Sequence, residues 1–260
     1  MTHSISNTDL AKNFRQLFEI SPALDAASIE AVYRIRHEVY CRDLGWEPVR
    51  ENGLESDAYD EQSVHCLLRK RDTGESVGCT RVILPHPDDP YRPLPFELSC
   101  SKVLDRTIAD PATMDRRSIA EVSRLAVLNF RQRKGENITA LSVSDGDFSR
   151  RDGVARFPFI PVSLYLSAIA IGQYLDIENL FVLTEPRLAK HFERIGFDIR
   201  PVGGSIEHRG TRIPSLLSSG NIVRDLRPAI KPLYAVIEES VREAFRKNNF
   251  ELGNLSAPSA

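Results

Sequence analysis

Arginine and carboxylate side chains are concentrated in a few short segments of this chain. An arginine beside a carboxylate forms an ion pair or holds an anionic ligand, and a carboxylate near an amine can act as a general base. The pattern predicts either a proton-transfer site or a network of ion pairs that holds an acidic loop in place. The residues that form it are Arg36, Glu55, Asp57, Asp60, Arg81, Glu121 and Arg124.

The segment around Glu121 has the composition of a strand. Because successive side chains of a strand point to opposite faces, Glu121, Ser123 and Leu125 should share one face. Arg124 should point to the other face unless a β-bulge intervenes. A structural ion pair between Glu121 and Arg124 is the alternative to a catalytic role for Glu121.

Hydrophobic spacing and turn signals predict the elements that must position these residues. Ser28 can cap a helix, and Gly45 can end it. The turn signal Asp72-Thr73-Gly74 separates two strands, and the prolines after the second strand predict an irregular excursion. We expect a helix over residues 28–44, an acidic loop over 47–61, strands over 63–69 and 75–84, and a short helix over 96–105.

The second half of the chain alternates between strands and helices. Pro186 suits the first turn of a helix, and Gly196 can stop it. We expect strands over residues 119–128, 179–184 and 197–202 and a last short strand after Thr211, with helices over 161–175, 186–195 and 228–247. This order indicates one domain of mixed α/β class.

Composition excludes several classes of protein. With 34 basic and 36 acidic residues, the chain lacks the basic excess of a nucleic-acid binder. Its four cysteines show no C-x-x-C spacing, which argues against a zinc site and favours reduced thiols in the cytoplasm. The uncharged stretch 157–175 approaches the length of a membrane span, but Pro158 and Pro161 favour a buried helix. None of the six histidines has an acidic or serine partner at a recognisable spacing.

Four motifs in this order resemble a known family. They are YRIRHEVYCRDLGW, E-x-D-x-x-D, GCTRVILP and AEVSRLAV. The resemblance, over residues 28–215, is to acyl-homoserine lactone synthases and long-chain N-acyl amino acid synthases, and most closely to acyltransferases associated with the PEP-CTERM/exosortase system. It implies a GNAT-like fold, a central mixed sheet flanked by helices, over residues 1–225. The helix within 226–248 would pack on this domain, and 249–260 would form a flexible tail.

The resemblance also implies roles for individual residues. Acyl transfer to an amine needs a neutral amine and a stabilised oxyanion. Glu121 would act as the catalytic base or hold a water, with Glu55 as the alternative, and backbone N–H groups of the strand 119–128 would face the thioester carbonyl. Tyr40 stands where the family usually has phenylalanine. The substrate-binding positions would be Arg36, Trp46, Asp57, Asp60, Arg81, Ser123, Arg124, Leu125 and Val127, although Trp46 could equally be a core residue.

A further motif concerns the acyl donor. Gln132-x-x-Gly135-x-Asn137 nearly matches the pyrophosphate loop of N-acetyltransferases, and Asn137 replaces its last small residue. This departure favours a phosphopantetheine arm, held by Gln132, Arg133 and Gly135, over coenzyme A. Basic residues between 131 and 156 could form a rim that attracts an acidic acyl carrier protein, or simply a solvated loop.

We therefore expect an enzyme that moves a fatty acyl chain from acyl carrier protein to the amino group of a small acceptor such as an amino acid. Acyl-CoA is the alternative donor, and no metal or tightly bound cofactor is implied. The alternatives are an acyl-homoserine lactone synthase using S-adenosylmethionine, a coenzyme A-dependent N-acetyltransferase, and a non-catalytic module that binds an acyl chain or carrier protein. We expect a cytoplasmic protein without nucleic-acid partners or a membrane span; peripheral membrane contact stays open.

Overall fold

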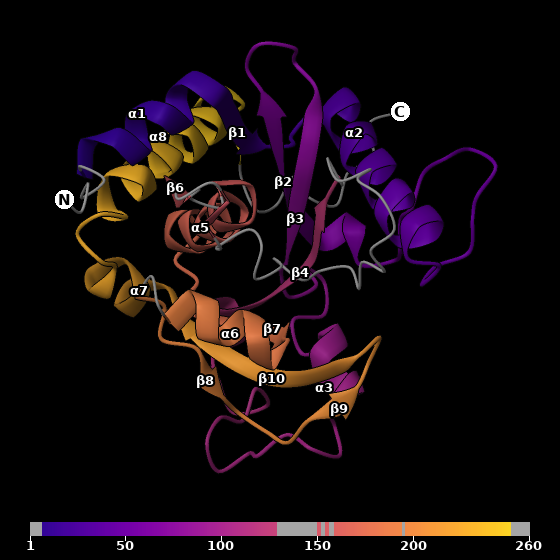
Figure 1. The fold of residues 1–260 in the computed structure, drawn as a ribbon. Helices are drawn as coiled ribbons and strands as arrows, with labels where there is room; N and C mark the ends of the chain where they lie inside the picture. Colours follow the sequence, from indigo (N-terminus) through magenta and orange to yellow (C-terminus); the bar gives the residue numbers. More distant parts are fainter. Residues whose placement is uncertain (1–6, 129–149, 152–153, 156–158, 194–195, 251–260) are drawn as a thin grey trace.

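The fold is built around one mixed sheet of eight strands (Figure 1). The computed structural model describes residues 7–128, 150–151, 154–155, 159–193 and 196–250. All neighbouring strands of the sheet are antiparallel except β4 and β7, which are parallel. In spatial order the strands are β1 (Phe18–Pro22), β2 (Ser63–Lys70), β3 (Ser76–Ile83), β4 (Ile119–Val127), β7 (Asn179–Thr184), β10 (Thr211–Ser218) and β8 (Arg200–Pro201), with β9 (Ile206–Glu207) also on β10. A separate pair is formed by β5 (Arg150–Arg151) and β6 (Val154–Ala155).

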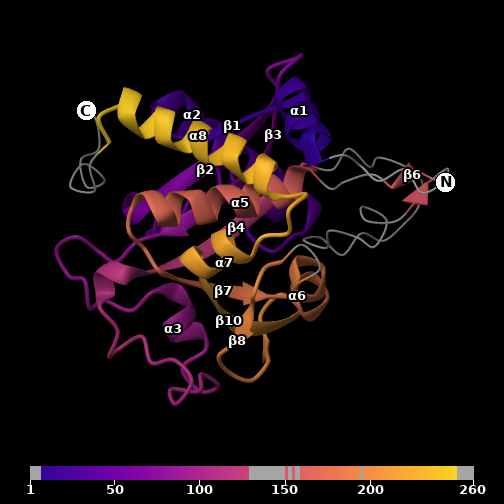
Figure 2. The same cartoon turned by 90° about the vertical axis from the view of Figure 1, so that its left-hand side faces the viewer.

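Helices cover both faces of the sheet (Figures 1 and 2). One face is covered by α5 (Phe159–Tyr174), which contacts β2 and β3 and in turn carries α8 (Lys231–Lys247). The short helix α7 (Ser219–Asp225) and the N-terminal helix α1 (Asn7–Leu17) complete this layer, and α2 (Ala26–Arg36) packs on the opposite face. Residues 161–172 are all buried, because α5 is enclosed between the sheet and α8. Among the described residues, no helix is long and apolar enough to cross a membrane, and the prediction of a buried helix is confirmed.

The strands β4 and β7 pair over only part of their length. Their register runs from Ile119 opposite Asn179 to Val122 opposite Val182, after which β7 continues beside β10 alone. Just beyond this point β4 contains a bulge against β3, and Arg124 adopts a positive φ of 52°. An extra residue in one strand re-aims the side chains around it. The Arg124 side chain therefore does not follow the regular alternation of a strand. This is the exception expected from the sequence if a β-bulge is present.

The predicted helix over residues 28–44 is divided into two parts. An α-helix ends at Arg36 and continues as a π-helical segment, His37–Asp43. The cap is Asp25 and not Ser28, because the Asp25 carboxylate accepts hydrogen bonds from both the backbone N–H and the hydroxyl of Ser28. Gly45 ends the segment at a φ of 60°, as expected.

The proline-rich excursion between β3 and β4 is held by a buried arginine. Arg116 donates to both carboxylate oxygens of Glu97, at 2.9 and 3.1 Å, and to backbone carbonyls that include Pro90 and Arg92. Glu97 lies on the short helix α3 (Pro95–Ser99), where it also accepts the Leu94 N–H. This set of contacts ties α3 and the excursion to the turn that leads into β4.

Several further elements differ from the sequence-based expectation. The strand predicted over 197–202 is reduced to the two residues of β8, while the last strand, predicted to be short, is the eight-residue β10. The helix predicted over 96–105 is only α3. The sequence analysis also missed α1 and β1. The strand β1 has only five residues and pairs with β2, so that tertiary contacts rather than local pattern define it.

Replacing Arg116 by methionine should destabilise the fold. Breaking a buried ion pair leaves the other charge without compensation, which costs about 3–5 kcal/mol. We expect Arg116→Met to lower the free energy of unfolding by about 3 kcal/mol in a urea titration. The exposed neighbour Arg117 supplies the control, since Arg117→Met should change stability by less than about 0.5 kcal/mol. A loss of less than 1 kcal/mol for Arg116→Met would contradict this role.

Candidate active site

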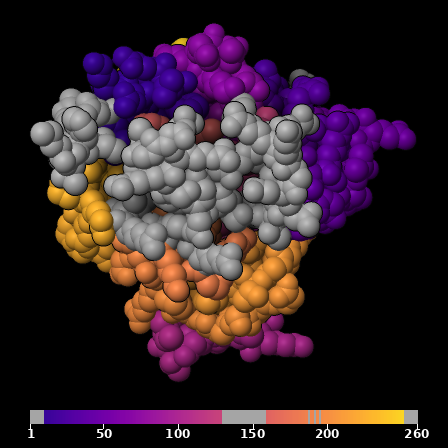
Figure 3. All heavy atoms as spheres, viewed as in Figure 1, coloured from indigo at the N-terminus to yellow at the C-terminus, as the bar shows by residue number. Residues whose placement is uncertain are grey.

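A cavity of about 280 Å³ lies where β4 and β7 separate. In the space-filling view, indigo and purple segments lie in the upper part of the molecule, and orange segments with a magenta segment below them lie in the lower part (Figure 3). Residues from both parts line the cavity. Of the predicted site residues, those in the lining are Trp46, Asp57, Arg81, Glu121, Ser123, Arg124 and Leu125.

The wall on the β2–β4 side is supported by buried ion pairs. Asp60 accepts a hydrogen bond from Arg36 and another from Arg81, both at 2.6 Å. Arg36 is fully buried and also donates to Glu55, which is itself 1% exposed. The alternative that the acidic loop pairs with arginines of the helix and strand is thus realised in the structure.

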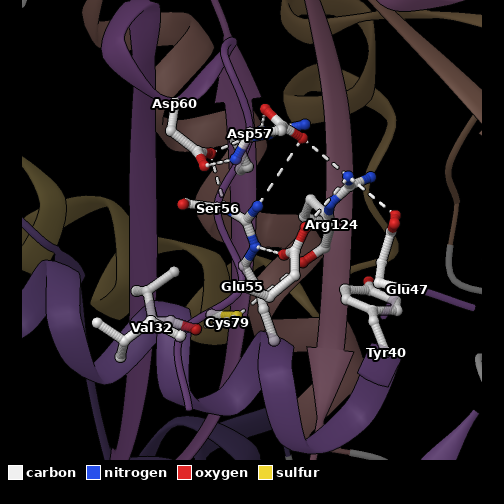
Figure 4. A network of polar contacts seen from close by, with 12 residues as sticks. Val32, Tyr40, Glu47, Glu55, Ser56, Asp57, Asp60, Cys79 and Arg124 are labelled. Carbon is white, nitrogen blue, oxygen red and sulfur yellow. Dashed lines mark hydrogen bonds and ion pairs between the residues drawn. The ribbon is translucent and has the colours of Figure 1, made fainter. Parts of the chain in front are cut away.

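Arg81 and Arg124 connect this buried group to the cavity. Arg81 donates to Asp57 at 2.6 Å and to the Ser123 hydroxyl at 3.1 Å. Arg124 donates to the second oxygen of Asp57 at 2.8 Å, and Figure 4 shows its guanidinium between Asp57 and Glu47. The bulge at Arg124 makes this possible, because it brings the guanidinium to the acidic loop.

The charges fix the protonation state of the network. Burial opposes ionisation of Asp60, but the guanidinium groups of Arg36 and Arg81 outweigh it and hold the pKa of that carboxyl well below its usual range. The pKa of Asp57 is lowered in the same way, with Arg81 and Arg124 outweighing burial. His65 has an acidic neighbour that sequence spacing did not indicate, since its Nε2 is 3.6 Å from an Asp60 oxygen. Burial nevertheless lowers the pKa of His65 to about 3, so that this histidine is neutral.

Glu121 lies outside this network, although it belongs to the same cavity. It is 4% exposed and accepts the Phe96 N–H of α3 at 2.8 Å. Burial raises the pKa of Glu121 to about 7, against the opposing effects of the Phe96 N–H and of Arg81 and Arg124. No ion pair joins it to Arg124, whose partners in the described residues are Glu47, Glu55 and Asp57. A carboxyl group that titrates near neutral pH is suited to proton transfer.

The remaining predicted site residues lie either in the aromatic part of the cavity wall, behind the wall, or in the core. Trp46 is partly buried and stacks on Tyr40, with ring centroids 5.9 Å apart, and the Tyr40 hydroxyl donates to the Leu125 carbonyl at 2.8 Å. Both aromatic rings line the cavity. Arg36, Glu55 and Asp60 lie behind the wall, and Val127 packs against the main core. The predicted phosphopantetheine positions Gln132, Arg133 and Gly135 lie outside the described residues.

The opposite wall was missed by the sequence analysis. It includes Glu185, directly after β7, which forms an ion pair with Arg212 of β10. Tyr165 of α5 also reaches the cavity, and burial raises the pKa of its hydroxyl above the usual range. These residues come from segments with no recognisable motif. The position of Glu185 at a strand end was the one available signal.

Comparison with known proteins gives a consistent result. A family profile described as "Acetyltransferase (GNAT) domain" matches residues 35–141. An acyl-homoserine-lactone synthase from Aliivibrio fischeri is 26% identical over 186 residues, which cover 72% of this chain and 82% of that protein. Another from Vibrio anguillarum is 31% identical over 70 residues, which cover 27% of this chain but only 35% of that relative.

Several solved structures are similar in fold. The acyl-homoserine lactone synthase LasI has a TM-score of 0.54 and 18% identity, covering 84% of this chain and 94% of that chain. MesI, a CoA-dependent acyl-homoserine lactone synthase, has a TM-score of 0.53 and 19% identity, with 90% and 96% covered. FeeM, an N-acyl amino acid synthase from uncultured soil microbes, has a TM-score of 0.51 and 15% identity, with 82% and 96% covered.

The mixed sheet with its separated parallel strands, together with the matched profile, defines the GNAT-like fold predicted from the sequence. The chain is an acyltransferase of this fold. Its homologues are acyl-homoserine lactone synthases, and the predicted resemblance to these enzymes is confirmed.

Removing the carboxylate shared by Arg36 and Arg81 should cost stability in a pH-dependent manner. We expect Asp60→Asn to lower the free energy of unfolding at pH 7 by about 3–5 kcal/mol, because two buried guanidinium groups lose a partner. The folded-state pKa of Asp60 is depressed, so its contribution is present above the unfolded value of 3.8 and is lost as the pH falls below it.

Urea titrations between pH 7 and pH 3 measure both effects. The stability difference between wild type and Asp60→Asn should shrink toward acid pH. Asp72→Asn, in the exposed hairpin turn, is the matched control and should leave stability unchanged. A difference that stays constant with pH would contradict the assigned ionisation of Asp60.

Proposed function

We propose that the enzyme transfers a fatty acyl group from a thioester donor to the amino group of a small acceptor. The observation that supports this most is Glu121, a buried carboxyl with a pKa near 7 on the cavity wall where β4 leaves β7. At neutral pH such a group is partly ionised, so it can accept the proton of an ammonium group directly or through water. The amine then attacks the thioester carbonyl, the C–N bond forms, the C–S bond breaks, and the thiol leaves with a proton.

The geometry of β4 supports the electrostatic part of this reaction. Beyond Val122 the edge of β4 has no partner in β7, and five consecutive residues, 121–125, line the cavity. Backbone N–H groups on an unpaired strand edge can hydrogen-bond to the developing oxyanion. In this proposal Glu55 is not a base, because Arg36 and Arg124 hold its carboxylate. Arg36, Glu55 and Asp60 act as positioning residues for Asp57, Arg81 and Arg124.

We propose acyl carrier protein as the donor, on the altered Gln132-x-x-Gly135-x-Asn137 motif. Acyl-CoA is the alternative, and a structural neighbour, MesI, is described as CoA-dependent. Thiol release measured with the same acyl chain on either carrier separates the two donors. A higher kcat/KM with acyl-CoA would contradict the carrier-protein donor.

For the acceptor we propose an amino acid, because the guanidinium groups that line the cavity can bind a carboxylate. The lining contains three carboxyl groups and four guanidinium groups. An amino acid offers a carboxylate to these groups without the additional positive charge of the sulfonium in S-adenosylmethionine, which guanidinium groups would repel. S-adenosylmethionine, and hence an acyl-homoserine lactone product, is the second candidate, supported by the Aliivibrio fischeri relative. The lining residues with charge are Asp57, Arg81, Glu121, Arg124, Glu185, Arg209 and Arg212.

The setting of the enzyme is part of the same proposal. All four cysteines are free and buried, which supports a cytoplasmic location. A link to exosortase stays a prediction from the sequence resemblance, because no relative described above bears on it.

Replacing Glu121 by glutamine should remove the base while keeping the size of the side chain. Loss of a general base typically reduces the rate by ~10²–10⁴-fold, so we expect a drop of this order in kcat/KM. The wild-type rate should rise as the pH increases through about 7, since only the ionised carboxylate accepts a proton. The rise should be absent in Glu121→Gln.

Mass spectrometry of lipid extracts from bacteria expressing the wild type or Glu121→Gln identifies the product, and thiol release gives the rates. The exposed Glu61, which is not among the cavity-lining residues, provides the control, since Glu61→Gln should retain full activity. An unchanged rate in Glu121→Gln would refute the assignment of Glu121. An N-acyl amino acid among the products would support the proposed acceptor, whereas an acyl-homoserine lactone would support the second candidate.

A further inference from the structure

The tip of the β9–β10 hairpin reaches a distant part of the chain at the cavity. Arg209 lies at this tip with a positive φ of 56°. Its guanidinium donates to Glu47 and lies 5.8 Å from the centre of the Trp46 ring. Trp46 and Arg209 both line the cavity. The contact therefore joins the hairpin to the segment after α2 at the substrate site.

Arg209 is the most exposed of the four arginines in the cavity lining. Its side chain is 28% exposed, compared with 19% for Arg124, 7% for Arg212 and 2% for Arg81. A guanidinium has five N–H donors, and in the described residues Glu47 is the one acceptor that Arg209 reaches. The described part of the chain thus leaves its remaining N–H groups open to a ligand.

Glu47 has a second cation within reach. Its carboxylate oxygen lies 3.6 Å from the Arg124 guanidinium. If a ligand carboxylate replaced Glu47 at Arg209, Glu47 would keep a partner in Arg124, so the exchange would leave no buried charge unpaired. Such an exchange needs little rearrangement, because Arg209 and Glu47 are both partly exposed.

We propose that Arg209 binds the α-carboxylate of the acceptor amino acid and that Glu47 competes for the same guanidinium. This inference rests on the proposed function and names its acceptor class, an amine with a free carboxylate next to it. The planar fork of arginine matches a carboxylate with two parallel hydrogen bonds. Trp46 forms the apolar side of the same subsite.

The test compares an amino acid with its carboxamide, which keeps the amine and loses the negative charge. The wild type first selects its acceptor from a panel of amino acids. We expect Arg209→Gln to raise the KM for this amino acid at least ~10-fold, the effect of losing a charge-assisted hydrogen bond, and to leave the KM for the carboxamide unchanged. Glu47→Gln should lower the KM for the amino acid several-fold, because the competitor has lost its charge.

The opposite signs separate ligand binding from a structural role. If the Arg209–Glu47 pair only held the hairpin in place, both variants would shift KM in the same direction for both acceptors, and the inference would fail. Arg15→Gln is the matched control, since Arg15 also pairs with a glutamate distant in sequence, Glu239, but lies outside the cavity lining. It should leave both KM values unchanged.

Calorimetry without any acyl donor distinguishes failure of the inference from failure of the proposed function. If calorimetry shows amino acid binding that requires Arg209, but the separate assay with acyl donor gives no product, the acyl transfer is refuted and the carboxylate site is supported. Product formation with unchanged KM in Arg209→Gln would support the transfer and refute the site. A wild type that binds none of the amino acids would refute the site as well.

Discussion

The site depends on the sharing of one buried carboxylate, that of Asp60, between two buried guanidinium groups. Arg36 comes from the end of α2, Arg81 from β3, and Asp60 from the loop between them. None of these charges could stay buried without the others, because an unpaired ion in the interior costs several kcal/mol. The sharing therefore fixes a helix, a strand and an acidic loop relative to one another, and through Asp57 it also fixes Arg124.

The site contains two kinds of carboxyl group, one held ionised by arginines and one that titrates near neutral pH. Asp57 and Asp60 face arginines, which hold their pKa values low, so they stay charged and serve as fixed anchors. Among the described residues, Glu121 accepts one backbone hydrogen bond, from the Phe96 N–H, and burial dominates, which raises its pKa to about 7. The difference arises from partners and not from residue type, as is usual where one site needs both permanent charges and an exchangeable proton.

The sequence was sufficient for the elements with strong local patterns. The strands of the β2–β3 hairpin, β4, β7 and the buried helix α5 appear close to their expected bounds, because their apolar runs and turn residues agree with the final packing. The arginines and carboxylates that meet at Asp60 were also singled out, since their types limit what can be buried together. The bulge at Arg124 was foreseen only as an exception, because alternation gives no sign of an inserted residue.

The cavity wall opposite the β2–β4 side could not be predicted from local sequence patterns. Glu185, Arg209 and Arg212 reach the cavity through the pairing of β7 with β10, which brings together segments without any shared pattern. The same reason explains the missed strand β1, whose place depends on β2. Non-local pairing, and not residue composition, was the missing information.

The ion pairs behind the cavity also bear on the order in which the chain assembles. The β2–β3 hairpin is local and can form early, but Arg36 meets Glu55 and Asp60 across 19 and 24 residues, and Arg124 meets Asp57 across 67. Contacts between distant segments must overcome the entropy of closing the intervening loops and so form late. Because Arg81 belongs to this hairpin and Asp60 directly precedes it, these two residues are close once the hairpin has formed, but the complete site exists only after α2 and β4 have joined it.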